Sequence, residues 1–399
     1  MLALAVGLMT IALAVVMRFP LWATMLASSL AMLAVSGSLP LFLKAVEGVG
    51  RLEYLCLYLA ACSISVLVSL YRESGAIDKL SRGLLGVIRQ PKLITALVPS
   101  VLGALSIPGG ALMSAPIVDK MGGELGFNKA QRLFLNIWYR HVIFLVYPLS
   151  PTILVASALA GTSVWSIALR TLPSFCAMVL MGYLLVLRGG KRGVEVEACG
   201  DLKELMSVSS PLLLAVTLAL MFQLYMSQLP RYLAVAAGAS AGVLALLILK
   251  EGDLGDLKAA VTCRLTLEVL ATTIGIIFFR EAFSASGASK CVAEFVGSRE
   301  LDKGLLLASL PFAISYVMGN SLSGVAISYP ILEGVGVGLR EVVLMFTSAF
   351  LGYLSSPMHM CYVYTAEYLR VNMRDGYKYM LPATAAVLAT AYLTYWWGP

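Results

Sequence analysis

The chain has 399 residues, of which 59% are hydrophobic and 13% charged, and its mean hydropathy is +0.87. Soluble globular domains carry about 25% charged residues, so this composition excludes a water-soluble protein and indicates a membrane protein. The formal net charge is +7. No basic cluster alternates with aromatic residues, which argues against a nucleic-acid partner. We therefore expect a lipid bilayer as the surroundings of the chain.

Long apolar segments lie between the charge clusters. A helix needs about 20 apolar residues to cross the hydrocarbon core. The first segment lacks the basic residues that open a signal peptide, so we expect a spanning helix there rather than a cleaved leader. The sequence predicts an all-α polytopic membrane protein. Its expected spans, about ten in number, are 2–17, 20–43, 53–71, 129–161, 164–187, 208–229, 231–249, 264–283, 339–369 and 379–397.

Two further apolar stretches, 93–121 and 304–334, are interrupted at their middles. Helix-breaking or polar residues stand there, and each half is too short to cross alone. We predict two re-entrant hairpins, each entering and leaving on one face. The alternative for each stretch is a single kinked span. The interruptions are Ser106-Ile107-Pro108-Gly109-Gly110 and Gly319-Asn320-Ser321-Leu322-Ser323-Gly324.

The long segment after each hairpin contains a proline break. Proline removes a backbone donor and clashes with the preceding turn, which frees carbonyl groups for a cation. A plain proline kink is the alternative. We expect these breaks and one hairpin glycine to bind the coupling ion, a sodium ion or a proton, with no other cofactor. The residues assigned to this ion are Ser150, Pro151, Thr152, Gly319, Ser355, Ser356, Pro357 and His359.

The two halves of the chain share short strings in the same order. Each half supplies five crossings and one hairpin, and an odd number of crossings inverts the second copy. We predict one repeat over 1–200, with scaffold helices in 1–50, hairpin 93–121 and broken helix 129–161. The second covers 201–399, with scaffold helices 208–249, hairpin 304–334 and broken helix 339–369. The matching strings are Arg72-Glu73 with Arg280-Glu281, Ser74-Gly75-Ala76 with Ser286-Gly287-Ala288, Pro99 with Pro311, Pro116-Ile117 with Pro330-Ile331, and Tyr147 to Pro151 with Tyr353 to Pro357.

Lys and Arg placement predicts the orientation, because cytoplasmic loops carry the excess of these residues. With both hairpins re-entrant, most of them fall on one face, together with the basic segment 72–92. We therefore expect a multi-pass protein of the cell (plasma) membrane with both termini outside.

Arg140 lies inside an expected span, where an Arg costs roughly 2.5 to 3.5 kcal/mol on insertion scales. We interpret it as the anchor of a small anionic substrate, since its planar fork binds carboxylate or phosphate bidentately. The alternative is that Arg140 snorkels to the interface. Either histidine would suit a coupled proton. The residues expected to bind substrate are Ser106, Gly109, Gly110, Asn136, Arg140, His141, Asn320, Ser321 and Ser323.

The seven cysteines show no spacing typical of a metal site or a disulfide framework. We expect them to be small buried hydrophobic residues, and we expect no metal site. No motif of an intramembrane protease, a nucleophile elbow or a nucleotide-binding loop is present. These observations argue against an enzyme.

These hairpin tips and Ser-Pro breaks resemble those of the Ion Transporter superfamily, over nearly the whole chain. The strings Ser106 to Pro116 and Leu354 to Cys361 are most similar to an uncharacterised membrane family within it, domain of unknown function 401. The resemblance implies a homodimer with a scaffold domain and an elevator-like transport domain. The Ser-Asn-Thr tips and Thr-Pro-Pro breaks of the dicarboxylate branch are absent.

The function expected from the sequence is cation-coupled secondary transport of a small organic anion. One alternative is a sodium/proton antiporter without organic substrate, which requires a buried carboxylate; Glu268 and Glu367 are the nearest candidates. A remote alternative is an intramembrane enzyme.

Overall fold

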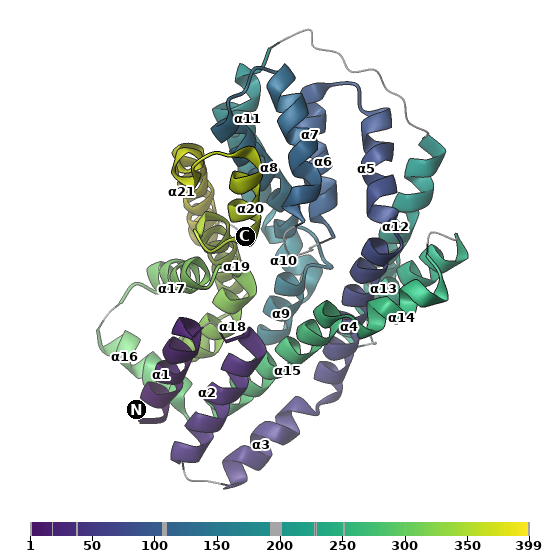
Figure 1. Cartoon of the computed structure of the whole chain (residues 1–399). Helices are drawn as coiled ribbons and strands as arrows, with labels where there is room; N and C mark the ends of the chain where they lie inside the picture. The colour runs from purple at the N-terminus through teal and green to yellow at the C-terminus, as the bar shows by residue number, and fades with distance from the viewer. Residues whose placement is uncertain are drawn as a thin grey trace.

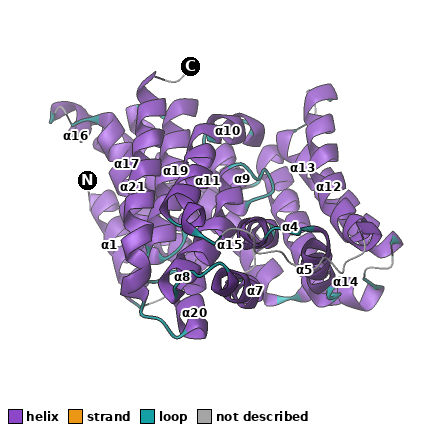
Figure 2. Ribbon diagram, turned by 90° about the horizontal axis from the view of Figure 1, so that it is seen from above, coloured by secondary structure: helices purple, strands orange, loops and turns teal. Residues whose placement is uncertain are grey.

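The structure is a computed structural model that describes residues 2–17, 19–36, 39–105, 110–191, 202–226, 228, 230–249, 252–299 and 301–397. Within these ranges it contains helices and loops and no strands (Figure 2). The predicted fold class, an all-α polytopic membrane protein, is confirmed.

The first half of the chain begins with three helices that precede the first long span. A hairpin and an interrupted helix follow that span (Figure 1). The elements are α1 (Leu2–Val16), α2 (Leu21–Ser36), α3 (Leu39–Val49), α4 (Leu52–Glu73), α5 (Ala76–Val87), α6 (Pro91–Gly103), α7 (Ala111–Glu124), α8 (Lys129–Val142), η1 (Ile143–Leu145), α9 (Pro151–Leu159), α10 (Val164–Arg170), α11 (Leu172–Leu185) and η2 (Leu187–Gly189).

The second half repeats this order with one helix fewer at its end. Its elements are α12 (Leu202–Tyr225), α13 (Arg231–Ile248), α14 (Leu254–Thr262), α15 (Arg264–Ala285), α16 (Ala288–Ser298), α17 (Lys303–Met318), α18 (Ser321–Leu332), η3 (Glu333–Val335), α19 (Leu339–Ser355), α20 (Met360–Leu369) and α21 (Met373–Trp397).

Several apolar segments expected to be single spans are divided into shorter helices. By length and composition, three described helical segments can cross a membrane unaided: Leu52–Glu73, Leu172–Gly189 and Leu202–Tyr225. The count rises to five if the bent pairs α9 with α10 and α14 with α15 each form one span. Segment 164–187 was expected to be one span, but it is split between α10 and α11. The Thr171 hydroxyl at this junction bonds the Leu145 carbonyl at 2.5 Å, and Pro173 opens α11.

Helices α4 and α15 occupy equivalent places in the two halves. Each has 22 residues and is followed by a left-handed glycine, Gly75 or Gly287, with φ of +71° and +72°. In both, the Ser before that glycine accepts a 3.4 Å hydrogen bond from the N–H of the residue after it. Helix α4 packs against α13 and α14, whereas α15 packs against α2 and α3. Each of these two helices therefore packs against helices from the other half of the chain.

These glycines also correct one of the matching strings. Arg72 lies three residues before Gly75, whereas Arg280 lies seven residues before Gly287. Arg280-Glu281 therefore sits one helical turn earlier than Arg72-Glu73. The two pairs share a sequence but are not structurally equivalent.

The helix that follows each break packs against the hairpin of the other half of the chain. Helix α9 packs against α18 of the second hairpin, and α20 packs against α7 of the first. Both hairpins, α6 with α7 and α17 with α18, also pack against the interrupted helices of their own halves, α8 and α19. Elements of both halves of the chain therefore pack around α8 and α19.

Candidate functional site

Both interrupted helices stop inside the protein. Helix α8 ends at Val142, continues as the short turn η1, and gives way to irregular backbone before α9 begins at Pro151. Helix α19 ends at Ser355, and α20 begins at Met360. In the break before α20, the Ser356 hydroxyl donates a 2.5 Å hydrogen bond to the Tyr316 carbonyl. A side-chain hydroxyl therefore satisfies one of the backbone carbonyl groups near these breaks.

Five side chains from α8, α19 and α20 meet where the two breaks face each other. We call this group the break cluster; its members are Arg140, His141, Tyr353, His359 and Cys361. Arg140 is 2% exposed, both histidines are 1% exposed, and Cys361 is also buried, whereas Tyr353 is partly buried. The two imidazole rings are 4.6 Å apart, and the Tyr353 ring lies 4.1 Å from that of His359.

Several polar atoms of the break cluster lack hydrogen bonds. Arg140 contacts the sulfur of Cys361, but its Nη1 atom has no hydrogen-bond partner. Neither ring nitrogen of His359 has a hydrogen-bond partner, although the Leu354 backbone lies near. Buried polar groups are paired in about 90% of cases or more. Donors that converge unpaired in one buried place therefore point to a ligand.

Asn136 lies one turn earlier on α8 and has the opposite character. Its Oδ1 accepts from the Ser114 hydroxyl at 2.7 Å, and its Nδ2 donates to the Ala111 carbonyl at 3.0 Å and to Thr365 Oγ1 at 3.1 Å. An amide nitrogen has two hydrogens, so both donors are used. The Asn136 amide connects the first hairpin to α20. Its expected part in substrate binding stays a prediction.

The first hairpin tip is described only in part. Ser106, Ile107, Pro108 and Gly109 lie outside the described residues. Gly110 is buried and forms the N-cap of α7. The structure thus places one of the three tip residues that were expected to bind substrate.

The second hairpin tip contacts both breaks. Gly319 has a left-handed φ of +62°, and a Cβ added there would stand 2.8 Å from the Met358 carbonyl. Ser321 and Thr152 exchange a 3.0 Å hydrogen bond, which joins this tip to the start of α9. Asn320 is exposed, and its Oδ1 accepts from the Leu322 N–H at 2.8 Å, capping α18.

Unpaired buried hydroxyls continue from this tip along α17, α18 and α19. They belong to Ser315, Ser323, Ser328, Thr347 and Ser348. Ser150 and Ser355 are also buried; the Ser355 hydroxyl pairs with the Leu351 carbonyl at 2.9 Å and with Thr384 at 3.0 Å. Hydroxyl oxygens suit a hard cation such as sodium. Pro151 and Pro357 mark the breaks but offer no side-chain ligand.

Two comparisons with known proteins identify the family and the fold. The model of the family described as "Protein of unknown function (DUF401)" matches residues 57–396. The chain belongs to this family. No curated protein matches it in sequence. Its fold is similar to the crystal structure of the YdaH transporter of Alcanivorax borkumensis, described as having an unusual topology, with a TM-score of 0.63 and 15% identity. The match covers 90% of this chain and 87% of that one.

Two members of the break cluster, Tyr353 and Cys361, are not among the residues that the sequence predicts for the site. Cys361 follows His359 by two residues, but that spacing alone is uninformative. The phenol of Tyr353 lies 3.3 Å from His141 Nε2, a contact between residues 212 positions apart. Tertiary packing alone brings these residues together.

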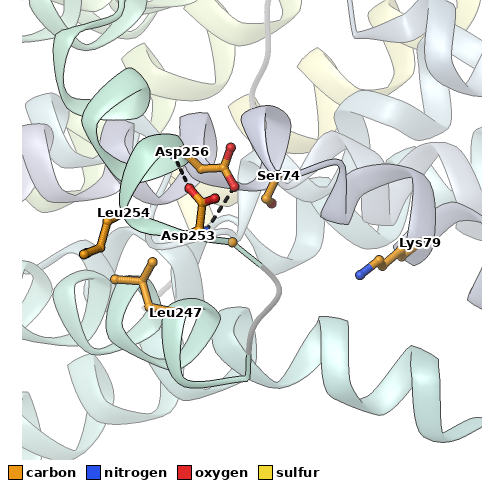
Figure 3. A pocket seen from close by; sticks show the side chains of 7 residues that line it. Ser74, Lys79, Leu247, Asp253, Leu254 and Asp256 are labelled. Atoms are coloured by element: carbon orange, nitrogen blue, oxygen red, sulfur yellow. Dashed lines mark hydrogen bonds between the residues drawn. The ribbon is translucent and has the colours of Figure 1, made fainter.

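A surface pocket of about 630 Å³ lies between the end of α4 and the start of α14 (Figure 3). None of the residues that line it belongs to the break cluster. Asp253 and Asp256 line it, and each carboxylate accepts the other residue's backbone N–H at the start of α14. This reciprocal capping explains their proximity. The acidic pair therefore carries no argument for a ligand.

Proposed function

We propose that the protein is a cation-coupled secondary active transporter of a small organic anion. The observation that carries the proposal is the buried Arg140 with its unpaired Nη1 at the meeting of two helix breaks. Arg140 is too deeply buried to snorkel. A bound carboxylate or phosphate supplies the missing acceptor and the missing countercharge together. The similar fold of a transporter supports the proposal.

The coupling ion, sodium or a proton, binds beside this anchor. The unpaired hydroxyls of Ser323 and Ser348 and the oxygens at the breaks are ligands for sodium, whereas His359 accepts a proton. Either ion adds positive charge near the anion site, and binding of one ligand therefore favours binding of the other.

Transport follows an elevator mechanism in which the hairpins and interrupted helices move against a scaffold that includes α4 and α15. An ion pair joins the two units where α15 meets the second hairpin, because Arg280 pairs with Glu333 at 2.7 Å. The neighbouring Glu281 lies 3.7 Å from Arg51 within the scaffold. Helix α9 also rests on α4 and α15, with a small apolar cavity of about 30 Å³ among them. This limited polar contact permits sliding.

The protein works in the plasma membrane as a homodimer with both termini outside. The second repeat is inverted relative to the first. A Cys introduced for Lys120, just before the end of α7, is labelled only from the cytoplasm, and one introduced for Gly334 only from outside. This test uses a background lacking the seven native cysteines. Labelling of both positions from the same face would contradict the inverted arrangement.

The central test measures ligand-induced thermal stabilisation of the purified full chain. A ligand at 100 times its dissociation constant stabilises the bound state by about 2.7 kcal/mol. Carboxylates, sugar acids and oxyanions are each screened with sodium or choline as the cation, at two pH values. We expect one anion class to raise the melting temperature in a cation-dependent or pH-dependent way.

The matched variants are Arg140→Gln, Arg140→Lys and, as the control, Arg132→Gln on the same helix. Arg132 pairs with Asp119 at 2.7 Å outside the break cluster. We expect both Arg140 variants to bind the anion at least roughly 30-fold more weakly, since a lost charge-assisted pair costs about 2 kcal/mol or more. The control keeps its affinity. Full anion affinity in a well-folded Arg140→Gln protein would remove the anchor.

The antiporter rival finds little support at its two carboxylates. Glu367 is exposed, and Glu268 bonds Arg264 at 2.7 Å on the protein surface. Stabilisation by sodium or pH alone, with no response to any anion, would favour that rival.

A further inference from the structure

We infer that the break cluster contains a binding site for one soft metal ion of low charge, copper(I) in class. Its ligands are His141, His359 and Cys361. One ligand atom from each residue lies within 4.8 Å of the other two, and all three residues are buried. The proposed anion anchor, Arg140, contacts one of these ligands, but the metal site does not rest on the transport proposal.

The hydrogen bonds around the two histidines fit this role. His141 Nδ1 lies 2.7 Å from the Ile137 carbonyl, which fixes the proton on that nitrogen. The other nitrogen, Nε2, is then an acceptor, and its present partner is the Tyr353 phenol at 3.3 Å, which a metal ion would displace. A backbone carbonyl holding the second nitrogen is the usual arrangement of metal-bound histidine. His359 has neither ring nitrogen paired, although it is 1% exposed. A metal bond satisfies one of these nitrogens.

The distances are close to those of a metal site. Bonds of about 2.0 to 2.3 Å to nitrogen and sulfur place ligand atoms about 4 Å apart or less around a single ion. The observed spread of 4.8 Å therefore closes with side-chain shifts on the order of 1 Å. Three ligands without a carboxylate suit a low-coordinate ion.

Ligand type and charge select the metal. Thiolate ligands favour copper(I) and zinc, and imidazole suits copper as well. Arg140 contacts the same sulfur, and a guanidinium is protonated in proteins. With the Arg140 cation, the Cys361 thiolate and a monovalent metal ion, the cluster has a net charge of +1. With zinc the net charge is +2, and the cluster has no acidic group to balance it. Uncompensated buried charge is costly, so the monovalent ion is favoured.

The binding step is a ligand exchange without electron transfer. The S–H bond of Cys361 breaks, a sulfur–metal bond forms, and the proton leaves to solvent. The metal remains copper(I) throughout. The bound ion ties the end of α8 to the start of α20 across the two breaks.

The test is an anaerobic titration of the full-length protein in detergent with copper(I), in competition with a chromophoric chelator. We expect one copper per chain, and X-ray absorption should show one sulfur and two nitrogen neighbours. Cys361→Ser and His359→Gln should each weaken copper binding roughly 100-fold or more. Cys56→Ser replaces a buried cysteine of α4 outside the cluster and should change nothing.

The wild-type titration decides the proposal even if a variant misfolds. Absence of one-to-one copper(I) binding would overturn it, as would undiminished binding in well-folded Cys361→Ser protein. Zinc binding more tightly than copper(I) at these residues would overturn the choice of a low-charge ion. Anion stabilisation in the metal-free protein is measured separately, so failure of either proposal leaves the other standing.

Discussion

Two polar groups one turn apart on α8 differ in how their hydrogen bonds are used. Asn136 has its carbonyl oxygen and both amide hydrogens paired with Ser114, Ala111 and Thr365. Arg140, one turn later, has an unpaired nitrogen although it is as deeply buried. A satisfied buried network holds helices together, whereas an unsatisfied one is incomplete without a ligand. The comparison therefore contrasts a side chain whose hydrogen bonds are complete with one that has an unpaired atom.

The largest expected effect comes from breaking the satisfied network. Asn136→Leu keeps a similar volume but leaves the Ala111 carbonyl and Thr365 without these partners, at a cost of about 3 kcal/mol in unfolding free energy. Thermal unfolding of the purified protein measures it. The control is Arg140→Gln, which should lower stability less and anion binding more. Equal stability of Asn136→Leu and wild type would show that this network is dispensable.

A smaller loss is expected when only one partner of Asn136 is removed. Ser114→Ala takes away the 2.7 Å donor to Asn136 Oδ1 and leaves that oxygen buried. We expect a loss of about 1.5 kcal/mol and unchanged anion affinity. The double variant Ser114→Ala, Asn136→Leu should lose less than the sum of the single losses, because both remove the same bond. Additive losses would mean that the two side chains act independently.

Asn320 is an exposed polar residue at the second hairpin tip, and its side-chain oxygen already accepts a hydrogen bond. Asn320→Ala removes the cap of α18, worth about 1 kcal/mol, and we expect weaker stabilisation by sodium or by pH. Asn372→Ala is a matched control, since Asn372 accepts from the N–H two residues on at 3.0 Å before α21. If both variants lose the same stability and keep the same ion response, Asn320 is a cap and nothing more.

The smallest effect concerns an unpaired hydroxyl. Thr347 is buried on α19 without a hydrogen bond, and Thr347→Val keeps its shape while deleting the hydroxyl. We expect stability without added sodium to stay level or to rise by about 1 kcal/mol. Thr365→Val, which removes a paired hydroxyl, should instead destabilise. A large loss in Thr347→Val would show that this hydroxyl has a partner in the resting protein.

The sequence was sufficient for the fold class and for the position of Arg140 inside an apolar segment. Composition determines these features, because few charged residues and long apolar segments have no soluble alternative. It also marked the two breaks, since a proline cannot continue a helix from the preceding turn: Pro151 begins α9, and Pro357 lies between α19 and α20. Such signals are local along the chain. The expected boundaries of the two repeats, and the inversion itself, stay predictions.

Only the tertiary structure determined which buried polar side chains have all their hydrogen bonds made and which have an unpaired atom. Asn136 and Arg140 were both candidates for substrate binding by sequence, and only the packing of α7 and α20 around α8 showed that the Asn136 side chain has all its hydrogen bonds made. Likewise, Cys361 looked like one of seven apolar cysteines until the two breaks placed it beside His141, which is 220 positions earlier. Hydrogen-bond partners distant in the chain leave no periodic trace in the sequence, so only the folded contacts reveal them.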